Sequence, residues 1–295
     1  MNEFVLSIDT KKKPNLSIVG GKGLNIIKLL KIRGINVPKG FIISTQVFNK
    51  FLEFNRIKID RNIKEKIQES KFPESLKEEI FVIYNEIFRP DESLIVRSSS
   101  TLEDIKRTSF AGQFESYLNI KGFNMLLNHV KKCWCSAFSE RVSSYLKAMR
   151  IKKEISMAVI IQRLVNADSA GVMFTINPIT KDKNQILIES NFGLGTTVVS
   201  GSVTPDSFII DKNSMEIIDK NLGSKKIMAV SRENGIENVQ IPKKEQNKYS
   251  LSDKQIINLA ESGKIIEERF KLPQDVEWSI EKDNVYITQT RPVTV

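Results

Sequence analysis

Apolar and polar positions divide the chain into a helix-rich first half and a strand-rich second half. The spacing of apolar residues in the first half predicts helices over residues 24–34, 45–54, 61–70, 75–88 and 126–149. Short apolar runs at Phe41–Ile43 and Ser93–Arg97 predict strands between these helices, and the second of them leads into a polar loop, Ser98–Asp104.

The pattern of the second half predicts short strands and one long helix. Strand-like runs cover residues 158–164, 171–175, 186–190, 208–211, 215–219, 275–281 and 285–291. Residues 231–250 are polar and predict a surface excursion, whereas 252–270 predict a helix that begins with a capping box of Ser252 and Gln255. We therefore predict an α+β protein with a mixed α/β lobe over residues 1–155 and a β-rich lobe over residues 156–295.

Composition is consistent with a soluble globular protein. The 295 residues suffice for one large domain or two lobes, with 40% hydrophobic and 27% charged residues. Met1–Thr10 mixes polar and apolar residues, and no stretch approaches the ~20 apolar residues that span a bilayer. We therefore expect a cytoplasmic protein without a membrane partner.

The net charge of +10 favours either an anionic ligand or a lysine-rich surface. The lysines are scattered, without an aromatic-interleaved basic stripe, so we expect no nucleic-acid partner. Cys133 and Cys135 fit neither a disulfide framework nor a zinc site, and we expect reduced, structural thiols.

Two segments of the first lobe could bind phosphate. Gly20–Gly23 precedes a predicted helix, where small residues let backbone N–H groups approach an anion, although a glycine turn without a ligand is an alternative. Arg97 ends a strand, where its guanidinium could bind phosphate or pair with Glu103 or Asp104. The small-residue loop Ser109–Gln113 follows and could fold over a triphosphate.

The last two predicted strands carry candidate metal ligands. Strand alternation places Asp275 and Glu277 on one face, and Gln289 and Arg291 share one face of the next strand. Carboxylate and amide oxygens suit Mg²⁺, although these polar residues could simply face solvent. A shared metal requires Glu277 to pair with Gln289.

That register makes two further predictions. It places Asp275 opposite Arg291, and it pairs residue 281 with 285, which leaves a three-residue connection of Lys282, Asp283 and Asn284. A slip of one residue would put Glu277 and Gln289 on opposite faces. An even-length turn with regular pairing on both sides would be such a slip.

Seven motifs together resemble a known family. They are VGGKGLN, LIVRSSSTLED, SFAGQFES, IIQRLVNADSAGVMFTINP, NFGLGTTVVSGSVTPD, DVEW and ITQTRP. Their order and spacing are similar to the N-terminal ATP-binding domain of phosphoenolpyruvate synthase, pyruvate phosphate dikinase and rifampin phosphotransferase. The likeness spans residues 16–293 and implies an ATP-grasp fold, with the nucleotide in a cleft between two lobes.

The resemblance also implies roles for individual residues. Lys22 and Arg97 would hold ATP phosphates under a loop that contains Gly112 and Ser116, and Gln162 would lie in the hinge strand that meets the adenine. Glu277 and Gln289 would bind Mg²⁺, and Arg291 would stabilise the transferring phosphoryl group, because phosphoryl transfer depends on positioning and charge neutralisation. Thr196 and Ser202 depart from the pattern, in which many relatives carry an acid and a long residue.

The acceptor domains of the related enzymes have no counterpart in these residues. We therefore expect an ATP-dependent phosphotransferase that phosphorylates a histidine on a separate protein. Direct phosphorylation of a small molecule and a non-catalytic nucleotide-binding module are the alternatives. His129, the single histidine, lies within the predicted helix of residues 126–149, where we expect a structural role rather than that of a phosphocarrier.

Overall fold

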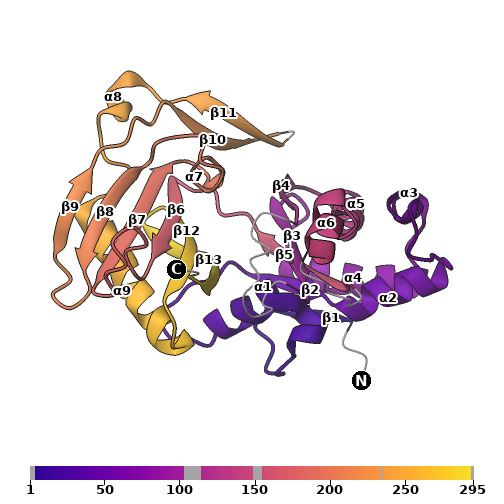
Figure 1. Ribbon diagram of the computed structural model, residues 1–295. Coiled ribbons are helices and arrows are strands. Elements are labelled where there is room, and N and C mark those ends of the chain that lie inside the picture. Colours follow the sequence, from indigo (N-terminus) through magenta and orange to yellow (C-terminus); the bar gives the residue numbers. More distant parts are fainter. Residues whose placement is uncertain (1–3, 103–113, 149–154, 234, 294–295) are drawn as a thin grey trace. The chain divides into compact units, whose positions relative to one another are not determined.

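The computed structural model describes residues 4–102, 114–148, 155–233 and 235–293, which form two compact units (Figure 1). Unit 1 falls within residues 1–27 and 39–164, and unit 2 within residues 28–38 and 165–295. The predicted boundary between residues 155 and 156 thus differs from the observed one, because the strand that ends at Arg163 pairs within the sheet of unit 1.

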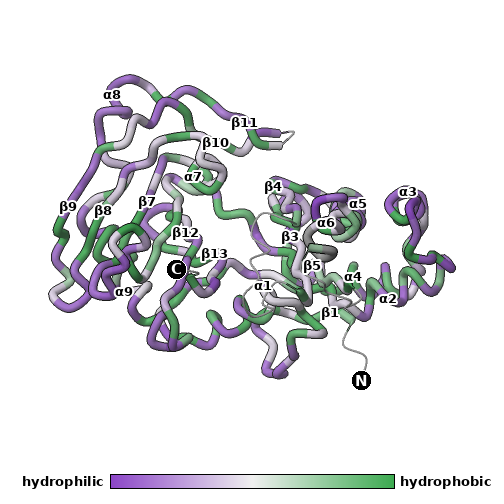
Figure 2. The backbone as a smooth tube through the Cα atoms, in the orientation of Figure 1, coloured by the Kyte–Doolittle hydropathy of each residue, from purple (hydrophilic) through white to green (hydrophobic). Residues whose placement is uncertain are grey.

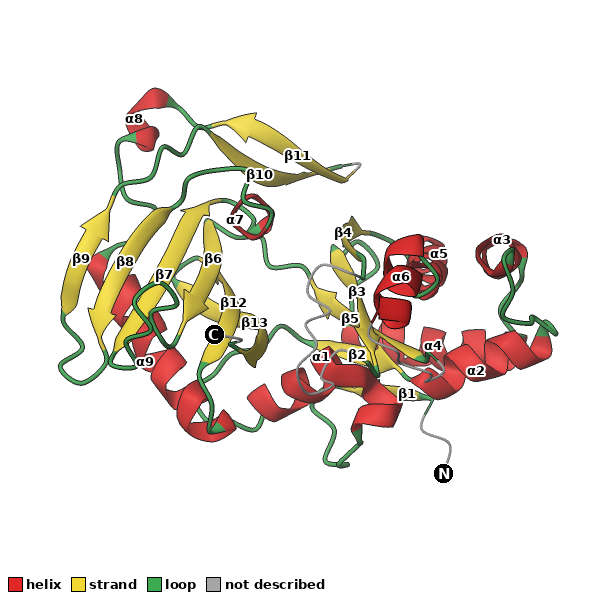
Figure 3. Ribbon diagram, in the orientation of Figure 1, coloured by secondary structure: helices red, strands yellow, loops and turns green. Residues whose placement is uncertain are grey.

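Unit 1 is built on a five-stranded antiparallel sheet in the order β1-β2-β5-β3-β4 (Figure 3). Its strands are β1 (Val5–Ser7), β2 (Gly40–Ile43), β3 (Leu94–Ser100), β4 (Ser116–Ile120) and β5 (Met157–Arg163). Its helices are α1 (Leu16–Leu29), α2 (Thr45–Phe54), α3 (Ile63–Glu69), α4 (Glu74–Ile87), α5 (Phe123–Ser136) and α6 (Glu140–Ala148).

The two faces of this sheet have different neighbours. Alternate residues, such as Val96 and Ile161, pack into a core with α2, α4 and α5. Trp134 of α5 lies at its centre, fully buried, within 5.4 Å of the ring centroids of Phe48 and Phe51. The opposite face contacts α1, where Ser99 of β3 and Ile42 of β2 lie beside the first glycine motif.

The structure divides the predicted helix of residues 126–149 into α5 and α6. The Ser139 hydroxyl accepts a hydrogen bond from the main-chain N–H of Val142 at 3.2 Å, which caps α6 and favours a new helix start. Apolar periodicity continues across the break because Ala137 and Val142 still contact the same core.

The polar loop predicted after Arg97 is shorter than expected, since Ser98–Ser100 continue β3 and pair with β5.

Unit 2 contains a six-stranded antiparallel sheet in the order β13-β12-β6-β7-β8-β9. Its strands are β6 (Ser169–Phe174), β7 (Gln185–Phe192), β8 (Asp206–Asp211), β9 (Ile217–Asn221), β12 (Gln274–Glu281) and β13 (Asn284–Pro292). A separate hairpin consists of β10 (Ile227–Arg232) and β11 (Gly235–Gln240), and the helices are α7 (Thr196–Val199), α8 (Lys243–Gln246) and α9 (Asp253–Phe270). This hairpin occupies part of the segment that the sequence predicts as a polar excursion.

Helix α9 covers one face of the six-stranded sheet (Figure 1). The predicted capping box is confirmed, since the Ser252 hydroxyl accepts from the Gln255 N–H and the Gln255 side chain accepts from the Ser252 N–H. Val276 and Trp278 of β12 pack beneath α9 in the core of unit 2. Alternation along β12 therefore points Asp275 and Glu277 to the opposite face.

Residues 28–38 belong to unit 2 although they precede most of unit 1 in sequence. Leu29, Ile32 and Ile35 are buried in the core of unit 2. The Asn36 main-chain oxygen accepts a hydrogen bond from the Ile287 N–H of β13 at 2.8 Å. Unit 2 is consequently assembled from two separate stretches of chain.

A buried ion pair lies at the start of β8. The side chains of Asp206 and Lys225 are both fully buried, and Lys225 Nζ lies 2.5 Å from Asp206 Oδ1. The Asp206 carboxylate also accepts hydrogen bonds from the N–H groups of Gly223 and Ser250 and from the Ser250 hydroxyl. The pair connects β8 to the segment that leads into β10.

Hydropathy follows this architecture (Figure 2). Hydrophobic residues are concentrated on β7 and β8, whereas α8 is hydrophilic. Over the described part of the chain, no helix has both the length and the apolar composition required to cross a membrane.

Candidate functional site

The first glycine motif forms a sharp kink in α1. Gly20 has φ 68° and ψ 176°, and a Cβ atom there would lie 2.2 Å from the main-chain oxygen of Ser99. The Gly23 N–H donates to the Ser99 hydroxyl at 3.0 Å, and that hydroxyl donates to the Val19 oxygen at 2.7 Å. The helix that restarts after Gly20 is therefore fixed against β3, with its first turn beside the end of that strand.

The structure brings Lys22 and Arg97 to this place. Lys22 Nζ donates to the main-chain oxygen of Ser98 at 3.2 Å, one residue after Arg97. Arg97 is 6% exposed, and strand alternation places its side chain on the same face as Ser99, which contacts α1. Two cations held beside a helix start favour an anionic ligand.

Ser116 and Gln162 lie on the same face of this sheet. Ser116 of β4 pairs directly with Arg97, and Gln162 of β5 pairs with Ile95, two residues before Arg97 on β3. Gln162 is almost completely buried, whereas Ser116 is exposed.

Gly112 and the candidate salt-bridge partners Glu103 and Asp104 lie outside the described residues. Ser99 is a residue that the sequence reasoning did not assign, although its place in a run of serines after a buried strand could have identified it.

The predicted pairing of Glu277 with Gln289 is confirmed on β12 and β13. Gln289 Nε2 donates to Glu277 Oε1 at 3.0 Å. Gln289 is 7% exposed, and within the described residues its Oε1 has no hydrogen-bond partner. A buried amide oxygen without a donor beside a carboxylate is a suitable ligand pair for a hard cation.

The turn of this hairpin differs from the prediction. Residue 281 pairs with 284 rather than 285, and the connection is Lys282–Asp283, with φ values of 49° and 65° that suit a two-residue turn. The even-length turn does not move Gln289 to the other face, because a bulge follows: Trp278 pairs with Ile287, and Thr288 is the extra residue. Regular pairing along the whole hairpin would require a three-residue connection, whereas the bulge at Thr288 allows a two-residue turn.

Arg291 is oriented by Asp275, its partner across the hairpin. Its Nε and Nη2 atoms donate to Asp275 Oδ2 at 2.8 and 2.6 Å. Burial raises the pKa of the Asp275 carboxyl, since desolvation exceeds the opposing effect of Arg291, and the charge of Glu277 adds to the rise. The Arg291 side chain is 45% exposed, so it remains accessible to a ligand.

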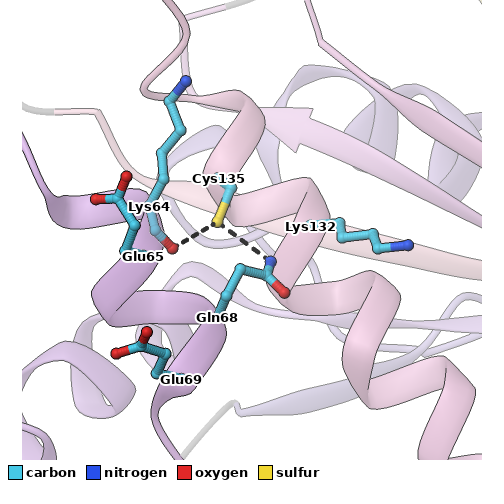
Figure 4. Close-up of a pocket in the computed structure, with 6 residues that line it drawn as sticks. All are labelled: Lys64, Glu65, Gln68, Glu69, Lys132 and Cys135. Carbon is cyan, nitrogen blue, oxygen red and sulfur yellow. Dashed lines mark hydrogen bonds between the residues drawn. The ribbon is translucent and has the colours of Figure 1, made fainter.

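None of these residues lines the pocket on unit 1 that is shown in Figure 4. It is lined by residues of α3 and α5, namely Lys64, Glu65, Gln68, Glu69, Lys132 and Cys135. Gln68 Nε2 lies 3.3 Å from the Cys135 sulfur, while the charged side chains point away from one another. Burial raises the pKa of the Cys135 thiol, which is partly buried, and Cys133 is buried; both are free cysteines. This pocket carries none of the predicted nucleotide residues.

His129 has the structural setting that the sequence predicts. It lies within α5 and is 6% exposed, and its Nδ1 atom contacts the Met125 main-chain oxygen at 2.8 Å. The Tyr117 ring packs edge-on against it, and Lys132 Nζ lies 3.4 Å from its Nε2. A ring packed on a helix in this way is poorly suited to reach a phosphate and then move away from it.

The substitution His129→Gln is expected to leave ATP binding and phosphoryl transfer near the original level. Burial lowers the pKa of His129, so the unfolded chain takes up a proton first as the pH falls below about 6.5. The original protein should therefore lose stability between pH 7.5 and 5.5, and the variant should lose less. Melting curves at both pH values measure this difference, and loss of transfer with binding intact would instead make His129 a phosphocarrier.

Comparison with known proteins assigns the chain to a family. Residues 16–295 match the family described as "Pyruvate phosphate dikinase, AMP/ATP-binding domain". The chain is 41% identical over 279 residues to "Uncharacterized phosphotransferase YvkC" of Bacillus subtilis, covering 94% of this chain and 33% of that protein. It is 37% identical over 316 residues to the rifampicin phosphotransferase of the same organism, covering 100% of this chain and 36% of the relative.

A third relative is the probable phosphoenolpyruvate synthase of Methanocaldococcus jannaschii, 36% identical over 318 residues, covering 99% of this chain and 27% of the relative. This protein belongs to the pyruvate phosphate dikinase AMP/ATP-binding domain family. The match confirms the resemblance, the ATP-grasp class and ATP as the ligand. The chain spans 33%, 36% and 27% of the length of these three relatives.

Proposed function

We propose that this protein binds Mg-ATP and transfers a phosphoryl group to a histidine on a separate protein. The observation that carries the proposal is the Glu277–Gln289 pair, in which a carboxylate lies beside a buried amide oxygen that receives no hydrogen bond from any residue the structure describes. The Lys22 and Arg97 cations and the kinked glycine motif support it, because a triphosphate needs both a metal and positive side chains.

Mg²⁺ fits the residues present. It binds oxygen ligands and takes few of them from the protein, the remainder being phosphate oxygens and water. The Glu277 carboxylate and the Gln289 Oε1 atom would hold it, after the hydrogen bond between these side chains rearranges. Bound Mg²⁺ would neutralise phosphate charge during transfer.

The protein side chains would orient the nucleotide and compensate charge. Lys22 and Arg97 would contact phosphate oxygens, and Ser116 would lie over the triphosphate. Gln162 would contact the adenine. Arg291, held by Asp275, would stabilise the charge on the transferring phosphoryl group.

His129 is unsuitable as the acceptor of the phosphoryl group, which supports transfer to a histidine outside these residues. It is the single histidine in these residues, and it is buried in a helix. Transfer requires the nucleophile to approach the phosphorus at ~3–3.5 Å, so a buried helical ring is unsuitable. Direct transfer of the phosphoryl group to a small molecule is the second candidate function. It is favoured because one relative is named a rifampicin phosphotransferase, and rifampicin is a small molecule.

The first test is stabilisation by the nucleotide. Saturating Mg-ATP is expected to raise the melting temperature, because a ligand that binds only the folded state contributes RT ln(1 + [L]/Kd), about 2.7 kcal/mol at a hundredfold excess over Kd. Differential scanning fluorimetry with ATP, with Mg²⁺ and with both measures the effect. A folded protein whose melting temperature does not respond to Mg-ATP would contradict the proposal.

The second part of the test identifies the acceptor. The His129→Gln variant is incubated with γ- or β-labelled ATP and cell extract, so that no histidine of this chain can take the label. Acid-labile label on another protein supports transfer to a histidine, whereas label on a small molecule supports the second candidate. Mg-ATP binding without transfer to either would leave a nucleotide-binding module.

A further inference from the structure

Glu189 lies in the same cross-strand row as the Glu277–Gln289 pair. The register runs from Gln289 of β13 to Glu277 of β12, Val172 of β6 and Glu189 of β7. Residues directly opposite one another project from the same face of a sheet. Glu189 therefore shares the face of Glu277, opposite to the face that α9 covers.

The spacing separates Glu189 from the candidate metal ligands. Two strand spacings place its backbone about 10 Å from that of Glu277, with the Val172 side chain between them. That distance is too large for both carboxylates to bind one ion at ordinary ligand distances. It is comparable to the distance from the phosphates of a nucleotide to its sugar.

The GLGT segment borders this face next to Glu189. Asn191, two residues further along β7, is fully buried, and its Nδ2 atom donates to Thr197 Oγ1 and to the Ile227 main-chain oxygen, both at 2.9 Å. A Cβ atom on Gly195 would lie 3.5 Å from the Ala170 Cβ atom of β6. The first residues of α7 and β10 therefore lie next to Glu189, at the β7 end of this cross-strand row.

The Glu189 carboxylate has no compensating partner among the described residues. No hydrogen bond or ion pair to its side chain occurs there, and burial raises its pKa. Asp206 of the neighbouring strand is the contrast, since it is more deeply buried but receives Lys225 and several N–H or O–H donors. A half-buried carboxylate without donors destabilises the unliganded protein and is suited to accept hydrogen bonds from a ligand.

We propose that the Glu189 carboxylate accepts hydrogen bonds from the ribose hydroxyl groups of the bound nucleotide and makes the site selective for ribonucleotides. The inference rests on the proposed binding of Mg-ATP at Glu277 and Gln289. A carboxylate repels the phosphates, and within the described residues no group of three acidic, histidine or cysteine side chains could hold a further metal. The ribose hydroxyls are the neutral donors nearest to the phosphates, and two adjacent hydroxyls match two carboxylate oxygens.

The test compares ATP with 2′-deoxy-ATP and 3′-deoxy-ATP, each with Mg²⁺, by titration calorimetry. The original protein is expected to bind ATP roughly ten- to a hundredfold more tightly than at least one deoxy analogue, the range for hydrogen bonds to a charged group. Glu189→Ala should lose most of this preference while its affinity for that analogue stays unchanged. Glu189→Gln, which keeps an acceptor oxygen, should retain an intermediate preference.

Two controls separate recognition from structure. Asp219→Asn removes an exposed carboxylate from β9 and should leave the preference unchanged. Without nucleotide, Glu189→Ala should melt at the same or a higher temperature at neutral pH, since a carboxyl with a raised pKa destabilises the folded state when ionised. Inosine triphosphate should be affected like ATP, because the proposed contact is to the sugar and not to the base amino group.

The outcomes are distinguishable. If the original protein binds ATP but Glu189→Ala keeps the full preference for ribose, this inference is wrong and the proposed function stands. An equal loss of affinity for ATP and for both deoxy analogues would indicate a structural role and also overturn it. If the original protein binds no nucleotide at all, the proposed function itself fails, and the inference with it.

Discussion

Lys225→Met is expected to lower the free energy of unfolding by about 3–5 kcal/mol, the range for a buried ion pair that loses one partner. Lys225 and Asp206 are both fully buried, so the substitution leaves a carboxylate without a counter-charge in a medium of low polarity. Methionine fills a similar volume, which keeps the effect of lost packing small. Urea denaturation followed by circular dichroism measures the change.

The chain offers a matched control in the next residue. Lys226 is exposed, and Lys226→Met should change the unfolding free energy by less than about 0.5 kcal/mol. In a second control, Asp206→Asn combined with Lys225→Met should be more stable than Lys225→Met alone, because a neutral amide replaces the unpaired charge. Equal stabilities of Lys225→Met and Lys226→Met would refute the importance of the pair.

Glu277→Gln is expected to reduce phosphoryl transfer roughly 10²–10³-fold, the usual effect of removing one electrostatic stabiliser of a transition state. The substitution replaces the charged member of the proposed ligand pair with a neutral amide of the same shape. The Mg²⁺ concentration for half-maximal activity should rise, while Lys22 and Arg97 continue to bind phosphate. Transfer of label from γ-labelled ATP, measured over a Mg²⁺ series, tests both effects.

A charge-matched control for this experiment is Glu268→Gln, an exposed residue of α9, the helix that covers the opposite face of the sheet from Glu277. This variant should show unchanged transfer and an unchanged Mg²⁺ requirement. The melting temperature of Glu277→Gln without ligand should also equal that of the original protein. Full transfer at an unaltered Mg²⁺ requirement would exclude Glu277 as a metal ligand.

The hairpin of β12 and β13 shows what strand alternation can predict. Alternation alone placed Asp275 and Glu277 on one face, because the side-chain period of two is a strong signal, and the structure buries Val276 and Trp278 of the other face in the core. Alternation could not predict the bulge at Thr288, because Thr288 is not a glycine and the sequence around it has no other feature typical of a β-bulge. The Thr288 hydroxyl, which donates to the Glu277 main-chain oxygen at 3.2 Å, is a contact that only the folded hairpin provides.

Long-range contacts explain the other differences. The segment with few apolar residues after residue 230 still forms β11, because β10 bonds to the glycine turn at Gly193 and Leu194 through Ala229. The helix break at Ser139 was recognisable, because a serine followed by Glu140 is a common helix start. Arg97, Ser116 and Gln162 were identified by motif, and the sheet face that they share follows from strand pairing that no local pattern contains.

The division of unit 2 into two stretches of chain has a consequence for folding during synthesis. Leu29, Ile32 and Ile35 emerge from the ribosome early, but the strands and the helix that bury them are made only after all of unit 1. Unit 1 can complete its core as soon as β5 is available, whereas these three side chains stay exposed to solvent until β12 and β13 follow. The nascent chain therefore carries an apolar segment that depends on late synthesis or on a chaperone for protection, and contacts of such high sequence separation fold slowly.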